Sequence, residues 1–78
     1  MNYPELTELL LRCGATYAGS IPPRARLKED MKMTSFGMML LLMELENVLN
    51  RPLSPTDFLP VRTVADLCGV LGVTHPAE

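Results

Sequence analysis

The sequence predicts an all-α protein: a small antiparallel four-helix bundle with three main helices, a one-turn third helix and a long loop between the first two. Three observations lead to this prediction. Apolar residues recur at positions i, i+3, i+4 and i+7 in separate segments, which is the spacing of a buried helix face. Of the 78 residues, 47% are hydrophobic but only 5% are aromatic, which suits aliphatic helices better than a β-sandwich. Proline and glycine stand between these segments, where helices begin or end.

The first helix is expected to begin near Pro4 and to end before Gly14. Proline is favoured in the first turn of a helix, and glycine is favoured just after the last one. Glu5 adds a negative charge near the amino end, which complements the helix dipole. One apolar stripe runs along this segment and predicts a helix that faces the core: Leu6, Leu9, Leu10 and Cys13.

Residues 15–34 show no sustained period and contain Gly19, Pro22 and Pro23. They predict a long connection, and an unstructured loop of this length is uncommon in a compact domain. Within it, the segment LKEDM is expected to form a turn of helix. Four apolar side chains are expected to anchor the connection across the bundle: Tyr17, Ile21, Leu27 and Met31.

The segment KMTSFGMMLLLMELENVL, residues 32–49, predicts the second main helix. At 100° per residue it has two apolar sides, so it is apolar all round for two turns and amphipathic afterwards. The broad face that should meet the core consists of Met38, Leu41, Leu42, Leu45, Val48 and Leu49. The shorter stripe nearly opposite consists of Phe36, Met39, Leu40 and Met43.

A single-turn helix is expected after Arg51-Pro52. Ser54 and Asp57 have the spacing of a capping box, and Pro60 ends the helix almost at once. This turn should place Phe58 in the core.

The last helix is expected to begin with a second capping box, formed by Thr63 and Asp66, and to end at Gly72. Its stripe consists of Val64, Leu67, Cys68 and Leu71. The whole chain, 1–78, is therefore expected to be one domain with an ordered core at about 3–72 and a loose tail at 73–78.

Charge and cysteine content exclude several classes of function. The net charge is only −2, and nucleic-acid-binding domains are usually clearly basic. Cys13 and Cys68 are expected to be half-buried free thiols, with a disulfide between them as the alternative. His75 stands alone, so no metal site is expected. The longest apolar run, 38–43, is too short to span a bilayer, and the amino terminus lacks the pattern of a signal peptide. We therefore expect a cytoplasmic protein with no membrane partner.

The segment LKEDMKMTSF resembles the L-x-E-D-L-G-x-D-S-L signature of carrier proteins, the acyl carrier proteins and their peptidyl relatives. The residues in register are Leu27, Glu29, Asp30, Met31, Ser35 and Phe36. Downstream, MELENVLNRPLSPTDFLPVRTVADL is similar to the second, one-turn third and T-V-x-D-L fourth helices of that family, without a gap. The resemblance covers roughly residues 4–71.

The resemblance implies that Ser35 carries a covalent 4′-phosphopantetheine arm and that the chain tethers acyl or aminoacyl groups as thioesters. It implies no catalytic residues, so we do not expect an enzyme. The expected partners are a phosphopantetheinyl transferase and the acyl- or aminoacyl-loading and downstream biosynthetic enzymes. We expect a free-standing monomer that serves a specialised pathway, such as polyketide or non-ribosomal peptide synthesis.

Two positions depart from the family pattern. The usual aspartate before the serine is Thr34, and the usual glycine is Lys32. In the family the aspartate helps to engage the transferase, so the change to Thr34 is expected to affect modification of Ser35 by a generic transferase. Threonine can still cap a helix, so the fold should be kept.

The helix face beside Ser35 is depleted of acid, whereas carriers for fatty-acid synthesis present an acidic second helix to basic enzymes. An exposed apolar stripe next to such a site is typical of a docking surface, and methionine adapts its shape to a partner. The expected docking residues are Thr34, Phe36, Met39, Leu40, Met43, Glu44 and Val61.

Other interpretations of the same residues compete with these. Ser35 has a residue type that often serves only as an N-cap. The apolar stripe could instead be covered by the long loop through Ile21, Leu27 and Met31, with Phe36 the side chain most readily tucked in. The fold could also be a degenerate carrier, an unmodified interaction module that binds partners through this stripe.

A nucleic-acid binder is the third functional class. Four of the seven basic residues lie within nine positions, namely Arg24, Arg26, Lys28 and Lys32. They fall in the expected loop beside two acids, and no helix has a basic face that could enter a groove. A solvated loop explains them better, so no nucleic-acid partner is expected.

Overall fold

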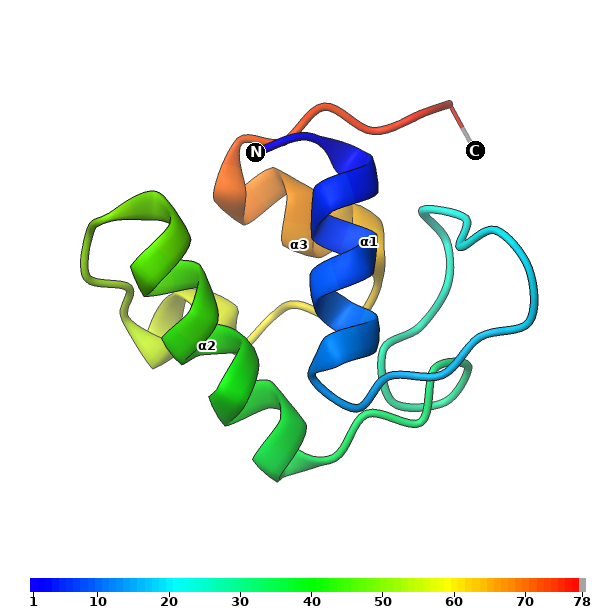
Figure 1. Cartoon of the computed structure of the whole chain (residues 1–78), viewed down its shortest axis with the longest axis horizontal. Helices are drawn as coiled ribbons and strands as arrows, with labels where there is room; N and C mark the ends of the chain where they lie inside the picture. The colour runs from blue at the N-terminus through cyan, green and yellow to red at the C-terminus, as the bar shows by residue number, and fades with distance from the viewer. Residues whose placement is uncertain (78) are drawn as a thin grey trace.

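The computed structural model describes residues 1–77 and confirms a small all-helical fold. Its elements are α1 (Tyr3–Arg12), α2 (Ser35–Leu49), the single-turn 3₁₀-helix η1 (Pro55–Phe58) and α3 (Val64–Leu71). In Figure 1, α2 lies on one side of α1 and the long loop on the other. Within the described part of the chain, no helix is both long and apolar enough to cross a membrane.

Side chains cap the helices at their amino ends. The expected capping box of α3 is confirmed, because Thr63 Oγ1 accepts from the Asp66 N–H and Asp66 accepts from the Thr63 N–H, each at 3.1 Å. A box at α1 was not expected: Asn2 and Glu5 exchange two hydrogen bonds of 2.9 Å. Gly72 ends α3 in the left-handed conformation, φ 71°.

The capping box predicted for the one-turn helix is wrong. Ser54 is its N-cap, but its hydroxyl accepts from the Thr56 N–H at 3.3 Å and not from Asp57. The reason is the tighter 3₁₀ turn, in which the Asp57 N–H already donates to the Ser54 carbonyl oxygen at 3.0 Å. Phe58 is buried, as predicted.

The long loop is tied to the helices by backbone hydrogen bonds. The Leu27 N–H donates to the Arg62 carbonyl oxygen at 2.9 Å, and the Val64 N–H donates to the Ala25 carbonyl oxygen at 3.0 Å. An isolated antiparallel bridge pairs Arg26 with Thr63 between these bonds. The loop is therefore an ordered strap that runs beside the start of α3.

The expected loop anchors are buried to different degrees. Leu27 and Met31 belong to the core, whereas Tyr17 and Ile21 are partly buried, and the Tyr3 hydroxyl donates to the Ile21 carbonyl oxygen at 2.8 Å. The expected turn in LKEDM is also present, since the Lys32 N–H donates to the Lys28 carbonyl oxygen at 3.1 Å.

The core contains Leu6, Leu9 and Leu10 of α1, Leu41 and Leu45 of α2, Phe58, and the stripe of α3. Val48 was expected on the core face but is 52% exposed, because it lies at the edge of that face, about 60° around the helix from Leu45. Of the tail expected to be loose, Val73 is buried and its N–H donates to the Cys68 carbonyl oxygen at 2.9 Å. Glu78 lies outside the described residues.

Cys13 and Cys68 are free thiols, and both are buried. Burial raises the pKa of each, and at Cys13 the charge of Glu44 raises it further while Arg12 opposes the shift. The disulfide alternative is therefore not realised. Among the residues that the structure describes, no group of three or more His, Cys, Asp or Glu side chains could hold a metal ion.

Candidate functional site

The candidate site is centred on Ser35, the first residue of α2. Thr34, in an extended conformation, is the N-cap, and its Oγ1 accepts from the Gly37 N–H at 3.0 Å. The interpretation of Ser35 as the cap itself is therefore wrong, because Thr34 occupies that position. Ser35 is exposed, and its hydroxyl takes no part in the hydrogen bonds found among residues 1–77.

A close contact between helices holds this end of α2 in place. Gly37 is buried, and a Cβ on it would lie 2.7 Å from the carbonyl oxygen of Cys13 at the end of α1. Any larger residue would push the two backbones apart. Gly37 thus fixes the start of α2 against α1, and with it the direction of the Ser35 side chain.

The backbone just before the site is held in an unusual conformation. Lys32 has φ 59°, in the left-handed region that favours glycine. The N–H groups on either side are bonded: Met31 donates to the Arg26 carbonyl oxygen at 3.0 Å and Met33 to that of Leu27 at 2.9 Å. Lys32 stands where the carrier signature has glycine. Glycine would adopt this left-handed conformation without strain, whereas lysine does not.

A hollow of about 430 Å³ opens beside Ser35, between the loop, α2 and η1. Its lining is mostly apolar, with Lys28, Glu29 and Arg62 as charged members. The apolar members are Leu27, Met38, Leu42, Pro55, Phe58, Leu59 and Val61. A larger hollow of about 560 Å³ lies against the basic loop and includes no residue of α2, so it is separate from the site.

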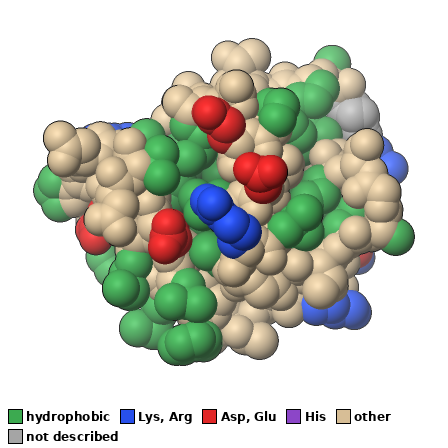
Figure 2. All heavy atoms as spheres, in the orientation of Figure 1, with side chains coloured by type: hydrophobic (Ala, Val, Ile, Leu, Met, Phe, Trp, Pro, Cys, Tyr) green, Lys and Arg blue, Asp and Glu red, His purple; other side chains and the backbone are tan. Residues whose placement is uncertain are grey.

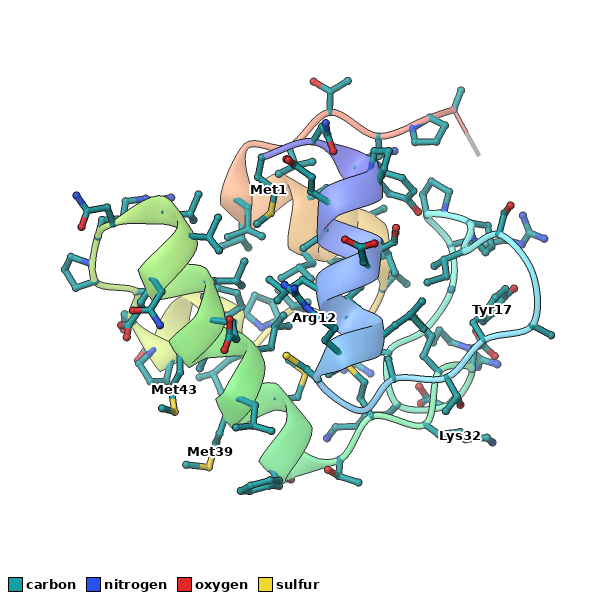
Figure 3. All side chains as sticks on the ribbon, viewed as in Figure 1. Met1, Arg12, Tyr17, Lys32, Met39 and Met43 are labelled. Atoms are coloured by element: carbon teal, nitrogen blue, oxygen red, sulfur yellow. The ribbon has the colours of Figure 1, made fainter. Side chains whose placement is uncertain are left out.

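The outward side of α2 carries bare apolar side chains. Phe36 is 69% exposed, Met39 63% and Met43 59%. Figure 3 shows Met39 and Met43 pointing away from α1, and Figure 2 shows hydrophobic side chains gathered over the lower part of this helix. The alternative in which the loop covers this stripe and tucks in Phe36 is wrong, because the loop turns toward α1 and α3 and does not cover this side.

The other expected docking residues lie in different surroundings. Thr34 and Glu44 are exposed, whereas Leu40 and Val61 are half-buried. Leu40 and Glu44 line a small hollow of about 250 Å³ together with Arg12 and Cys13, so they face α1. Val61 lines the hollow beside Ser35.

Sequence reasoning missed Leu59, which is 79% exposed at the end of η1 and lines the same hollow as Ser35. The signal was available, because Leu59 follows the buried Phe58 and precedes a proline in a helix of a single turn. Two consecutive residues of such a turn cannot both face the core.

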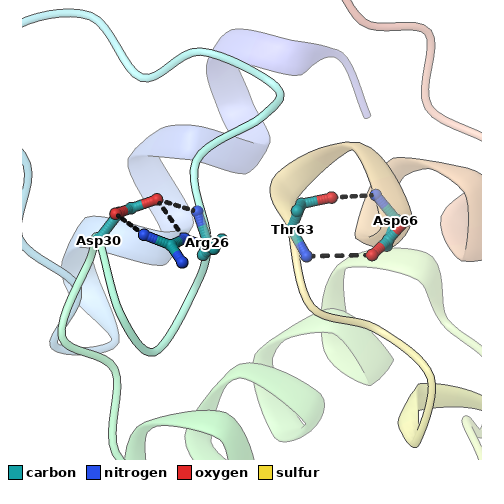
Figure 4. Close-up of polar contacts among 4 residues, drawn as sticks. All are labelled: Arg26, Asp30, Thr63 and Asp66. Carbon is teal, nitrogen blue, oxygen red and sulfur yellow. Dashed lines mark hydrogen bonds and ion pairs between the residues drawn. The ribbon is translucent and has the colours of Figure 1, made fainter.

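Two carboxylates brace the loop and α3 near the site (Figure 4). Asp30 accepts from Arg26 through Nε and Nη2 at 3.1 Å each, and from the Arg26 backbone N–H at 2.8 Å, which lowers the pKa of Asp30. Asp66 accepts from the backbone N–H groups of Arg62 and Thr63, which lowers the pKa of Asp66. Both carboxylates are therefore engaged within the chain.

Comparison with known proteins gives one result. A family model described as a phosphopantetheine attachment site matches residues 6–71, which is most of the chain. No curated protein and no solved structure matches the chain.

Proposed function

The chain belongs to the phosphopantetheine-attachment family, and on that basis we propose that it tethers acyl or aminoacyl groups on an arm attached to Ser35. Members of this family carry 4′-phosphopantetheine covalently and are carriers without catalytic activity, so the chain is a carrier and not an enzyme. The observation that carries the assignment to Ser35 is its exposed, unengaged hydroxyl at the first position of α2.

The residues around Ser35 fit a phosphodiester. The first N–H groups of a helix have no partner inside the helix, and the dipole there favours negative charge. Thr34 occupies only the Gly37 N–H, which leaves those of Ser35 and Phe36 for phosphate oxygens. Lys28 and Arg62 line the adjoining hollow and add positive charge.

The bound arm would supply a terminal thiol, which holds the cargo as a thioester. The chain's own residues would position the arm and its cargo. Met38 and Leu42 of α2 and Leu59, just after η1, form an apolar wall next to Ser35, against which an apolar cargo can lie. The capped start of α2 holds the attachment oxygen at the surface, within reach of partner enzymes.

We further propose a free-standing carrier for a specialised pathway, served by a phosphopantetheinyl transferase and by loading and downstream enzymes. What supports this is the outward side of α2, which offers apolar side chains in place of the acidic face of general carriers. A single intact mass from the host that equals this 8.7 kDa chain plus one arm would test the free-standing state.

An unmodified interaction module is the second candidate. It is favoured by Thr34 in place of aspartate together with the bare side chains of Phe36, Met39 and Met43. It differs from the first candidate in one observable, since it never carries an arm.

The test is to incubate the protein with coenzyme A and a broad-specificity transferase and to record the intact mass. We expect a gain of one phosphopantetheinyl group in the wild type and none in the Ser35→Ala control. The Thr34→Asp variant should be modified faster, because the acidic residue that transferases contact is restored while the cap is kept. A folded wild type that stays bare with every transferase tried would contradict the attachment and leave the interaction module.

A further inference from the structure

We infer that the transferase that attaches the arm to Ser35 docks on this chain through an uncharged apolar groove, and not through a cluster of basic side chains. This inference rests on the proposed function, because it names the kind of surface that the enzyme presents to the site. It concerns four residues near Ser35, which we call the apolar rim: Phe36, Met39 and Met43 on α2, and Leu59, which follows η1 directly.

The apolar rim is the part of the surface that a partner must cover to reach Ser35. Phe36, Met39 and Met43 follow each other at spacings of three and four, so they form one row along the outward side of α2. Leu59 lies on the other side, in the wall of the hollow that Ser35 shares. All four side chains are more than half exposed, and an exposed patch of this kind marks an interaction site.

The carboxylates of α2 are turned away from this row. The helix has no basic residue, and its two acids are Glu44 and Glu46. Glu46 is half-buried, and its Oε2 accepts from the Leu53 N–H at 2.9 Å, so it holds the connection to η1. Glu44 lines the hollow toward α1 beside Arg12, which Figure 3 shows between the two helices. A basic partner would therefore find no free carboxylate in the row.

The charged residues in the hollow beside Ser35 are positive by two to one. Lys28 and Arg62 share its hollow, where Glu29 is the only acid, and Lys32 is exposed three residues before Ser35. Like charges brought together across an interface cost several kcal/mol, so a basic docking surface would be disfavoured here. An apolar groove meets the row without this cost.

The position of the apolar rim favours an enzyme over a second copy of the chain. Its residues lie on the helix that begins with Ser35, and Leu59 shares a hollow with Ser35. A lasting dimer through the rim would cover Ser35, whereas a transferase must reach Ser35 and then leave. The rim therefore suits a brief encounter with the enzyme that attaches the arm.

The test measures docking separately from modification. The Ser35→Ala protein is titrated, in the presence of coenzyme A, against two transferases: one whose docking surface is an apolar groove and one whose docking surface is basic. Dissociation constants are measured by calorimetry at low salt and at about 1 M NaCl, where the Debye length is about 3 Å. Two further variants are made in the Ser35→Ala protein. One carries both Met39→Glu and Met43→Glu, and the other carries Val48→Glu as the matched control.

We expect the apolar-groove enzyme to bind at least about tenfold more tightly than the basic one, a difference of about 1.4 kcal/mol, and to change less than about twofold with salt. The paired glutamates should reverse this preference. Val48→Glu should change nothing, because Val48 lies in the last turn of α2 and not in the row. Circular dichroism confirms that each variant is folded.

Tighter binding to the basic enzyme, a steep loss of affinity with salt, no effect of the paired glutamates, or no binding to either enzyme would each overturn the inference. The proposed function stands or falls on a different readout, the mass of the wild-type chain after incubation. A wild type that is modified although its docking is ionic would refute the apolar groove and leave the carrier intact.

Discussion

Gly37 and Cys13 meet backbone to backbone where α1 ends and α2 begins. A Cβ at position 37 would lie 2.7 Å from the Cys13 carbonyl oxygen, closer than such atoms approach in proteins. The contact places the start of α2, and therefore Ser35, relative to the rest of the bundle. A glycine two residues after Ser35 is thus part of the geometry of the candidate site.

Replacing Gly37 with alanine should destabilise the protein. The added methyl group must displace a backbone carbonyl, and overpacking of this kind costs about 1–3 kcal/mol. Gly69→Ala is the matched control, because Gly69 lies within α3 with nothing within 4 Å of its would-be Cβ. That variant should gain roughly 0.5–1 kcal/mol from the better helix propensity of alanine. Urea unfolding of both proteins checks the prediction, and equal stabilities would contradict it.

The cap formed by Thr34 gives a second prediction. Thr34→Val keeps the shape but loses the oxygen that accepts from the Gly37 N–H, so the free energy of unfolding should fall by about 0.5–2 kcal/mol. Thr34→Ser keeps the oxygen and should remain close to the wild type. Thermal unfolding followed by circular dichroism separates them. A valine variant as stable as the serine variant would show that the cap contributes nothing.

Lys32 gives a third prediction, in the opposite direction. Its left-handed backbone costs roughly 1–2 kcal/mol for a residue with a Cβ, part of which is offset by the greater freedom of glycine in the unfolded chain. Lys32→Gly should therefore stabilise the protein by about 0.5–1 kcal/mol. Lys32→Ala keeps the Cβ and should change little. If alanine stabilises as much as glycine in denaturant unfolding, the charge and not the backbone is the cause.

Asp66 gives a pH dependence. Hydrogen bonds from the backbone N–H groups of Arg62 and Thr63 lower the pKa of Asp66 in the folded state below its usual value of about 3.9. Its contribution is therefore fully present above that usual value and is lost as the pH falls through the folded-state pKa. Asp66→Asn should be less stable than the wild type at neutral pH, and the difference should shrink on acidification below about pH 4. A difference that stays constant in urea unfolding from neutral to acidic pH would refute this.

The helices could be predicted from the sequence because their apolar spacing and caps are local signals. Thr63, Asp66 and Gly72 define α3 by themselves, and so the prediction there is confirmed. The sequence left two possibilities for Phe36, exposed for docking or covered by the loop. The choice depends on where a loop of about twenty residues passes, and the backbone bonds of Ala25 and Leu27 to the start of α3 decide that path.

The candidate site could be predicted only in part, because some of its features are local in the sequence and others depend on contacts between distant residues. A motif can point to Ser35, but the sequence does not show that Thr34 takes the cap, since both residue types favour that position. Nor does it show the contact between Gly37 and Cys13, which joins residues of different helices. The left-handed Lys32 breaks the local preference of its residue type, so only the surrounding backbone bonds reveal it.

The most direct test of the account is the state of Ser35 in protein purified from its native host. Trypsin does not cleave between Arg51 and Pro52, so the relevant tryptic peptide is 33–62, and fragmentation between Thr34 and Ser35 and before Ser54 and Thr56 assigns the modification to one hydroxyl group. We predict one phosphopantetheinyl group on this peptide, located on Ser35. A native chain that carries no such group, or carries it on Thr34, would contradict the central claim.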